Sequence, residues 1–436
     1  MIAAAAGAAA ALSAHLTAAG SPLTSPNQGT GDPLFSQGIN WEVIVIVIVK
    51  VLVAFVALLT ATAMMIWFER KVISDMQSRI GPNRAGPWGL LQTLADGTKL
   101  IFKEDLIPEQ SDSFTFKLAP YLSTVPAFIT FAVVPVGGFM RLGSHTFELQ
   151  VADPPIGILL VLAMSGIAVY GVMLAGWSSG SKYPLLGSVR ASAQVISYEA
   201  ALGMTVVTVV LVSHSLSTRA IVAAQSNGFW NWNLIRLGFV PFIFFMIAIT
   251  AELTRPPFDL TEADSELVGG FHTEYSSMRF GMFYLAEFMN TITMSAVVVT
   301  LFFGGPNGLI PPWPGATIYM PIIWFLLKTV AFCFIYVWFR AALPRLRYDQ
   351  LMDLGWKRLI PMSLAWLLLV AAIVTWHWRG LIMVPVVLAA SVLLVRATRL
   401  GSDASAHDSV LPSVGRRVAP ATRPLGGPGP RQGVDA

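Results

Sequence analysis

Residues 43–68 read VIVIVIVKVLVAFVALLTATAMMIWF, an apolar run with a single charged side chain, Lys50. As an α-helix, at about 1.5 Å per residue, such a run is long enough to cross the hydrocarbon core of a bilayer, which is about 30 Å thick. Hydrocarbon offers no partners to backbone N–H and C=O groups, so a segment that crosses it must satisfy its own hydrogen bonds. The stretch therefore predicts a membrane-spanning helix.

The rest of the chain has the same character. Of its 436 residues, 55% are hydrophobic and 12% are charged, whereas a soluble protein has roughly 25% charged residues. Further apolar runs follow at 117–140, 155–176, 192–213, 238–252, 280–303, 317–340, 359–376 and 380–396. We predict an all-α, polytopic integral membrane protein of about nine transmembrane helices, with a transmembrane domain at residues 41–397.

The basic residues predict the orientation of the chain. Loop 70–117 contains seven Lys and Arg residues and loop 340–358 contains five, whereas loop 304–316 contains none. Cytoplasmic loops carry the excess of Lys and Arg, so loops 70–117 and 340–358 are expected in the cytoplasm. The low-complexity residues 1–40, on the other side of the first helix, are then expected outside the cytoplasm. A ninth helix then places the basic tail, residues 398–436, in the cytoplasm, and its composition predicts disorder. The expected location is the inner (cytoplasmic) cell membrane.

Several function classes are excluded by composition. The net charge of +4 comes from basic residues in short loops, so we interpret it as a topology signal and expect no nucleic-acid partner. The single cysteine, Cys333, cannot form a disulfide framework or an iron–sulfur cluster within this chain. No histidine pair is placed for haem, and no nucleotide-binding or metal-ligand spacing stands out. We expect neither a bound cofactor or metal nor a catalytic residue acting alone.

Loop one predicts an amphipathic helix at the membrane interface. Apolar side chains recur near helical spacing at Leu90, Leu91, Leu94, Leu100 and Ile101. Polar side chains lie between them at Gln92, Asp96, Lys99 and Lys103. This pattern is typical of a helix lying in the interface. A surface anchor with no ligand is the alternative interpretation.

The loop at 252–279 is unusually acidic for this chain, with six carboxylates and two arginines. Its apolar residues predict partial burial. Carboxylates packed together away from water have raised pKa values, so they can hold or pass protons. The alternative is a solvated loop in which the charge has no such role.

Besides Lys50, three charged residues lie in the interior of the apolar runs: Glu199, Glu287 and Lys328. Such residues suggest a proton relay, because an unpaired charge is costly inside the membrane. Either glutamate could instead extend to the interface from near a helix end. Lys328 lies midway along its run, so we expect it to pair with an acid or face water, whereas Lys50 is expected to be structural.

Several motifs in order resemble a family of membrane subunits of proton-pumping NADH-quinone oxidoreductase (respiratory complex I), the H subunit family, also called subunit 1 of NADH dehydrogenase. They are Glu69-Arg70-Lys71, Arg79-Ile-Gly-Pro-Asn-Arg-Ala-Gly-Pro, Ala95-Asp96-Gly97 with Lys99-Leu100, Ser197-Tyr198-Glu199, the Pro-Phe-Asp-Leu loop ending at Leu260, and Pro344-Arg-Leu-Arg-Tyr-Asp-Gln350. The resemblance covers roughly residues 43–376 and implies eight family helices, with the C-terminal helix as an extra.

The resemblance implies a subunit that forms a quinone access channel with the peripheral arm and couples quinone reduction to proton translocation. The proton path implied here is Glu199, Glu252, Asp259, Glu262, Asp264, Glu266 and Glu287, to which Lys328 is added from its place in the membrane. The residues implied at the quinone channel or the peripheral-arm contact are Arg70, Arg79, Asp96 and Arg255, with Arg345 and Arg347 of the last motif. Ubiquinone or menaquinone would be the substrate, and FMN and iron–sulfur clusters would lie in partner subunits.

Two departures from the family pattern affect this expectation. Thr254-Arg255-Pro256 stands where the family commonly has Asn-Arg before its Pro-Phe, and Asp264 replaces a frequent Glu, which shortens the reach of the carboxylate. The expected partners are the quinone-module, small membrane and antiporter-like subunits of the complex. The alternatives are a related subunit of a membrane-bound hydrogenase-type complex and an independent ion transporter.

Overall fold

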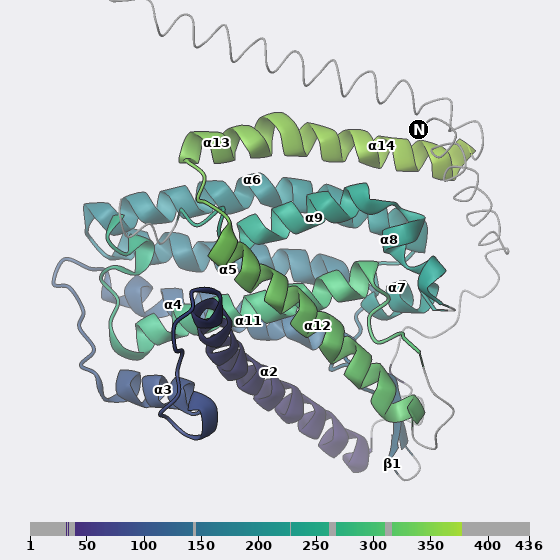
Figure 1. Ribbon diagram of the computed structural model, residues 1–436, viewed down its shortest axis with the longest axis horizontal. Helices are drawn as coiled ribbons and strands as arrows, with labels where there is room; N and C mark the ends of the chain where they lie inside the picture. Colours follow the sequence, from purple (N-terminus) through teal and green to yellow (C-terminus); the bar gives the residue numbers. More distant parts are fainter. Residues whose placement is uncertain are drawn as a thin grey trace, which may run out of the picture. The chain divides into compact units, whose positions relative to one another are not determined.

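The computed structural model describes residues 32, 34, 40–142, 145–226, 228–260, 267–309 and 316–376, all of which fall in one compact unit. The predicted ninth helix, the tail and most of residues 1–40 lie outside the described residues. Within this part of the chain the structure is almost entirely helical (Figure 1).

Each of the eight apolar runs before residue 377 forms a helix. They are α2 (Trp41–Met76), α4 (Ser113–Ala132), α5 (Gly157–Ser178), α6 (Lys182–Ser213), α9 (Phe239–Glu252), α11 (Ser277–Phe302), α12 (Ala316–Ala342) and α14 (Ile360–Trp376). Among the described residues, six helical segments are long and apolar enough to cross a membrane: α2, α5, α6, α11, most of α12, and Tyr348–Thr375, which includes α14. The predicted all-α polytopic architecture is confirmed.

Shorter elements connect these helices. They are α3 (Gln92–Phe102), α7 (Thr218–Ala224), α8 (Asn233–Arg236), α13 (Tyr348–Met352), a π-helical turn at Asp353–Leu359, and 3-10 turns at Pro87–Gly89, Phe229–Asn231 and Gly270–His272. Helix α3 is the helix predicted in loop one. Its apolar side chains Leu94, Ile101 and Phe102 are exposed, as an interfacial helix requires.

The prediction of one continuous apolar helical run at 117–140 is wrong at its end. Helix α4 stops at Ala132, and the chain then forms a hairpin of β1 (Phe139–Leu142) and β2 (His145–Glu148), in which Phe139 pairs with Glu148. Pro135 and the glycines that follow it disfavour a helix there. An apolar run does not by itself distinguish a buried helix from a strand.

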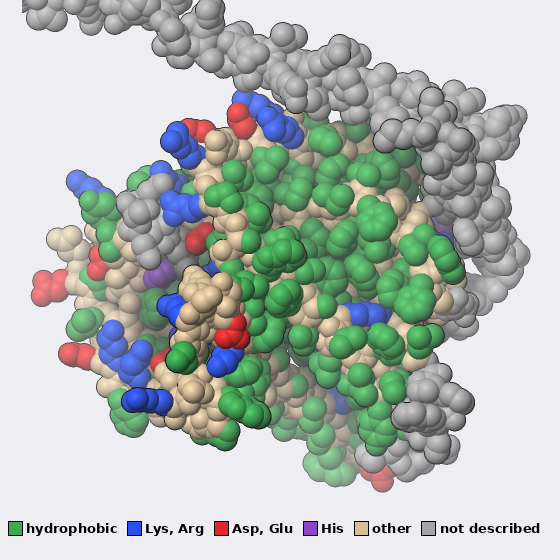
Figure 2. Space-filling model, viewed as in Figure 1, with side chains coloured by type: hydrophobic (Ala, Val, Ile, Leu, Met, Phe, Trp, Pro, Cys, Tyr) green, Lys and Arg blue, Asp and Glu red, His purple; other side chains and the backbone are tan. Residues whose placement is uncertain are grey.

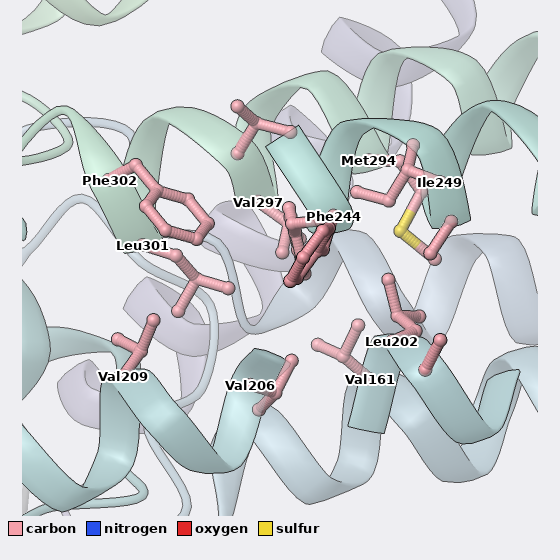
Figure 3. Close-up of a cluster of buried hydrophobic side chains, with 14 of the residues drawn as sticks. Val161, Leu202, Val206, Val209, Phe244, Ile249, Met294, Val297, Leu301 and Phe302 are labelled. Atoms are coloured by element: carbon pink, nitrogen blue, oxygen red, sulfur yellow. The ribbon is translucent and has the colours of Figure 1, made fainter. Parts of the chain in front are cut away.

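Helix α6 lies at the centre of the largest core, where it packs against α5, α9 and α14. Helix α4 packs against α5 and α11. Figure 3 shows the interior of this core: Leu202 and Val206 of α6 face Phe244 and Ile249 of α9, with α11 side chains such as Val297 alongside. Close side-chain packing of this kind is what holds transmembrane helices together, since lipid is as apolar as the core.

The surface separates apolar from charged regions. In Figure 2 hydrophobic side chains cover the middle of the visible face, and Lys, Arg, Asp and Glu side chains gather toward the left, where α3 and α13 lie in Figure 1. Helix α2 exposes much of its apolar surface, including Leu52 and Val53. Such exposure is expected of side chains that face lipid.

Candidate functional site

The end of α9 positions the central residue of the site, Arg255. Thr254 adopts a left-handed conformation (φ +51°), and the Arg255 N–H donates to the carbonyl of Thr250 at 3.2 Å, which closes the helix end. Proline at 256 cannot continue the helix. Gln194 Nε2 donates to the carbonyl oxygens of Ala251 and Phe258, each at 2.8 Å, and so ties the segment to α6.

Arg255 joins two carboxylates from different helices. Its Nη1 lies 3.2 Å from Glu69 Oε2 of α2, and its Nη2 lies 3.0 Å from Glu287 Oε1 of α11. Arg340, in the last turn of α12, pairs with the other oxygen of Glu69. We call Glu69, Arg255, Glu287 and Arg340 the arginine cluster. Arg255 and Arg340, which follow Glu69 by 186 and 271 positions in the sequence, are thereby brought into contact with it.

The arginine cluster is formally neutral, and it is buried at Glu69 and Arg255, whereas Glu287 and Arg340 are partly exposed. Only 4% of the Arg255 side chain and 7% of the Glu69 side chain are exposed. The Arg255 guanidinium also lies 4.7 Å from the centre of the Phe288 ring, a cation–π contact. Removing charges from water is costly, so the arrangement is stable only while its positive and negative charges balance. A change of charge at one member therefore affects the others.

Two cavities flank the arginine cluster. The inner cavity, about 130 Å³, lies among α4, α5, α6 and α11; its polar lining includes Ser165, Glu252, His272, Tyr284, Glu287 and Asn290. The loop-one cavity, about 560 Å³, is lined by α2, the residues that follow it, and Arg340. Tyr284 lines both cavities. The arginine cluster therefore lies between the two cavities: Glu287 lines the inner cavity, and Glu69 and Arg340 line the loop-one cavity.

Three of the sequence-predicted acids gather at the inner cavity. Glu252 and Glu287 line it directly. Glu252 is buried beside Ser165, and Glu199 is close enough to repel it electrostatically. Glu199 lies well inside the 32-residue helix α6 rather than near its end, because the helix begins earlier than the apolar run. These three acids lie close together, Glu252 buried and Glu199 and Glu287 half-buried, and their membership of a proton path stays a prediction.

Loop one supplies basic residues to the second cavity. Arg70 and Arg79 line the loop-one cavity, and Arg70 Nη1 lies 2.6 Å from Asp96 Oδ2 of α3. Trp67 Nε1 donates to the carbonyl of Trp88 at 3.0 Å, and Thr93 donates to that of Ala63 at 3.1 Å. These contacts hold α3 and the Gly-Pro segment against the end of α2.

Other predicted residues lie elsewhere. Glu262, Asp264 and Glu266 are outside the described residues, and Asp259 is half-buried just before them. Arg345 and Arg347 are exposed between α12 and α13 and are not in the lining of either cavity.

Lys328 was expected to pair with an acid or to face water. Among the described residues it pairs with no acid, and it lines neither of the two cavities. Its Nζ donates to the carbonyl oxygens of Phe303, Gly305 and Asn307 at 2.8, 3.0 and 2.6 Å, just beyond the end of α11. It also lies 4.6 Å from the centre of the Trp232 ring. A lysine beside the last carbonyls of a helix stabilises the negative end of the helix dipole. Its membership of a proton path stays a prediction.

Four residues of the site were not assigned from the sequence: Glu69, Arg340, Tyr284 and His272. Glu69 belongs to the motif Glu69-Arg70-Lys71, and in the sequence Arg340 indicates only the orientation of its loop. Burial was the missing information, since charges at the ends of two distant apolar runs give no sign of meeting. Tyr284 and His272 carried no signal beyond residue type.

The comparisons with known proteins agree with this architecture. Residues 49–371 match the NADH dehydrogenase family. The chain is 50% identical over 331 residues to the H subunit of NADH-quinone oxidoreductase from Frankia casuarinae, covering 75% of this chain and 72% of that protein. It is 46% identical over 344 residues to an H subunit of NADH-quinone oxidoreductase from Koribacter versatilis, covering 76% and 97%. The chain therefore belongs to the NADH dehydrogenase family.

Proposed function

We propose that this chain is the membrane subunit of a proton-pumping NADH-quinone oxidoreductase that forms the quinone access channel and couples quinone reduction to proton translocation. The observation that carries the proposal is the pair of cavities that meet at Tyr284, with the arginine cluster between them. Relatives named as H subunits, at 46% and 50% identity, support the assignment. Electrons would come from FMN and iron–sulfur clusters of partner subunits, so this chain would bind no redox cofactor itself.

The loop-one cavity suits the entrance of the channel. It is the larger space, it is lined by the basic residues Arg70, Arg79 and Arg340, and it lies in the loop where positive charge predicts the cytoplasmic side. A soluble peripheral arm would dock on this face. The inner cavity, with a mostly apolar lining and a few polar groups, has the character of a site for a small apolar ligand.

Coupling would act through charge. Reduction of a quinone to a quinol takes up two electrons, which partner subunits would supply, and two protons. Groups such as His272 and Tyr284 that gave up these protons would each become more negative by one charge, close to Glu287. Glu287 is held by Arg255, which also holds Glu69, so a change at one carboxylate alters the balance of the whole arginine cluster. Glu252 and Glu199 would then adjust their protonation, since neighbouring buried acids titrate together. The antiporter-like partner subunits would receive that change.

Filling the inner cavity tests this function. Ala168 of α5 lines the cavity, and an Ala168→Phe substitution would occupy it. We expect the assembled complex to lose at least about tenfold of its NADH-quinone activity while oxidation of NADH by ferricyanide stays near normal, because ferricyanide takes electrons from the peripheral arm. A tenfold loss corresponds to about 1.4 kcal/mol of added barrier.

A neighbouring position provides the control. Ile167 is on the same helix but is exposed on the outer face, so Ile167→Phe adds a ring without filling the cavity. It should keep both activities. Wild-type quinone reduction in assembled Ala168→Phe complex would exclude the inner cavity from the quinone path.

A further inference from the structure

A second, largely buried charge cluster lies at the β1–β2 hairpin, beside the first half of α2. Glu148 of β2 is 7% exposed, and its carboxylate pairs with Arg219 of α7 at 3.2 Å. Lys50 of α2 pairs with Asp32 at 2.5 Å, and Asp32 Oδ1 also accepts the Glu148 N–H at 3.4 Å. Asp153 faces the same group and is fixed by Ser217 at 2.8 Å. We call these five side chains the hairpin cluster.

Two residues that precede α2, Asp32 and Leu34, contact this cluster. Asp32 supplies the ionic contact to Lys50 and the hydrogen bond from the hairpin. Leu34 supplies an apolar contact: it is 1% exposed and packs with Val43 of α2 and Phe147 of β2. In Figure 1 the start of α2 lies beside β1. We call Asp32 and Leu34 the clasp.

The hairpin cluster has one negative charge too many when all its groups are ionised. Three carboxylates, Asp32, Glu148 and Asp153, face two cations, Lys50 and Arg219. His145 of β2 and Glu42 of α2 lie nearby and pair with each other at 2.9 Å. A buried site with an uncompensated negative charge is stabilised by taking up one proton.

Glu148 is the group best placed to take that proton. The pKa of Glu148 is raised to about 7: burial is the main cause, Asp153 and Asp32 add to the rise, and Arg219 and Lys50 oppose it. If Asp32 left the cluster, Glu148 would lose a repelling neighbour and gain attraction from the unpaired Lys50. The pKa of Glu148 would then fall, so the proton is held more tightly while the clasp is closed.

We propose that Asp32 and Leu34 form a pH-responsive clasp, in which these two residues are held against the hairpin and are held more tightly when the hairpin cluster binds a proton. The sign follows from linkage: a carboxyl whose pKa is higher in the closed state favours closure at low pH. Closure is strongest near the ordinary glutamate pKa of 4.5, weakens as the pH rises toward about 7, and is constant above it. The clasp involves residues outside the stretch 49–371 shared with the family.

Cysteine labelling in the purified complex tests the clasp. Detergent makes both sides accessible, and a Cys333→Ser background removes the one native cysteine. Leu34→Cys should react with a maleimide at least about tenfold more slowly than Trp41→Cys, which is 74% exposed. The rate of Leu34→Cys, divided by that of Trp41→Cys at the same pH to remove thiol ionisation, should rise about threefold or more from pH 6 to 8.

Two variants separate the ionic contact from the proton. Lys50→Gln removes the partner of Asp32 and should raise the relative rate about tenfold at every pH. Glu148→Gln removes the titrating group and should leave labelling slow at both pH values. Equal rates at Leu34→Cys and Trp41→Cys would overturn the clasp, and an unchanged pH dependence in Glu148→Gln would overturn its proton switch.

A measurement on the native side chains covers the case in which Leu34→Cys itself opens the clasp. The Leu34 N–H donates to Asp32 Oδ1 at 3.2 Å, so its amide should be protected from hydrogen exchange. We expect a higher protection factor at pH 6 than at pH 8 in the peptide that contains it, and loss of protection in Lys50→Gln. An unprotected Leu34 amide at pH 6 would contradict the proposal.

Discussion

Replacing Arg255 by methionine isolates the electrostatic core of the candidate site. Methionine approximates the length of the side chain but removes the charge that balances Glu69 and Glu287. Removing one partner of a buried ion pair costs about 3–5 kcal/mol. Arg340 still compensates Glu69, so we expect a cost near the lower figure, about 3 kcal/mol, which is roughly a hundredfold in an equilibrium constant.

The loss should be reversed by restoring neutrality. In Arg255→Met with Glu287→Gln, one positive and one negative charge remain, Arg340 and Glu69. We expect membranes with Arg255→Met to contain much less assembled complex than wild type, measured on native gels and normalised to ferricyanide activity. The double variant should recover assembly to within about threefold, while its quinone-linked activity stays low because Glu287 can no longer titrate.

An exposed ion pair gives the matched control. Lys357 and Asp353 pair at 2.8 Å with about half of each side chain exposed, and such pairs contribute about 0–1 kcal/mol. Lys357→Met should therefore assemble normally. Normal assembly of Arg255→Met, or a double variant no better than the single one, would refute the dependence of the arginine cluster on charge balance.

Two further variants and one spectrum test other parts of the account. Arg79→Ala, at the loop-one cavity, should weaken quinone reduction or assembly and spare ferricyanide activity; equal loss of both in assembled complex would count against a quinone role. Glu262→Gln should leave the complex assembled but lower quinone turnover and proton pumping together by about tenfold or more, whereas wild-type pumping would identify Glu262 as a solvated charge. The purified chain should show no haem, flavin or iron–sulfur absorbance, and a stoichiometric chromophore would contradict that expectation.

The helices were predictable because their cause is local. Each run such as 43–68 or 280–303 is predominantly apolar, and in hydrocarbon only a helix or a closed barrel satisfies the backbone. The error at 133–140 has a local cause too. Pro135 and the glycines that follow it disfavour a helix, but the apolar side chains around them continue the run and favour its extension to residue 140.

The candidate site was predictable only in part, because its contacts are not local. The resemblance to the family pointed to Glu199, Glu252, Arg255 and Glu287. In the structure Glu252 and Glu287 line the inner cavity, Glu199 lies near Glu252, and Arg255 pairs with Glu287. The pairing of Glu69 with both Arg255 and Arg340 depends on how α2, α9 and α12 cross, which no periodicity in the sequence encodes.

Lys328 shows the complementary limit of prediction from sequence. Its place midway along an apolar run correctly indicated that it needs a partner, but an acid or water was expected. Backbone carbonyls after α11 fill that role instead, because Phe303, Gly305 and Asn307 direct their oxygens toward it. Sequence reveals which charges need compensation, and only the fold reveals what compensates them.

The most direct test of the account is a structure of the assembled complex, determined by electron cryomicroscopy, with a quinone-site inhibitor bound. We predict density for the inhibitor that passes through the loop-one cavity and reaches the inner cavity beside Tyr284, within contact of the arginine cluster. Density confined to partner subunits, with both cavities filled only by lipid or water, would contradict the claim that this chain forms the quinone channel.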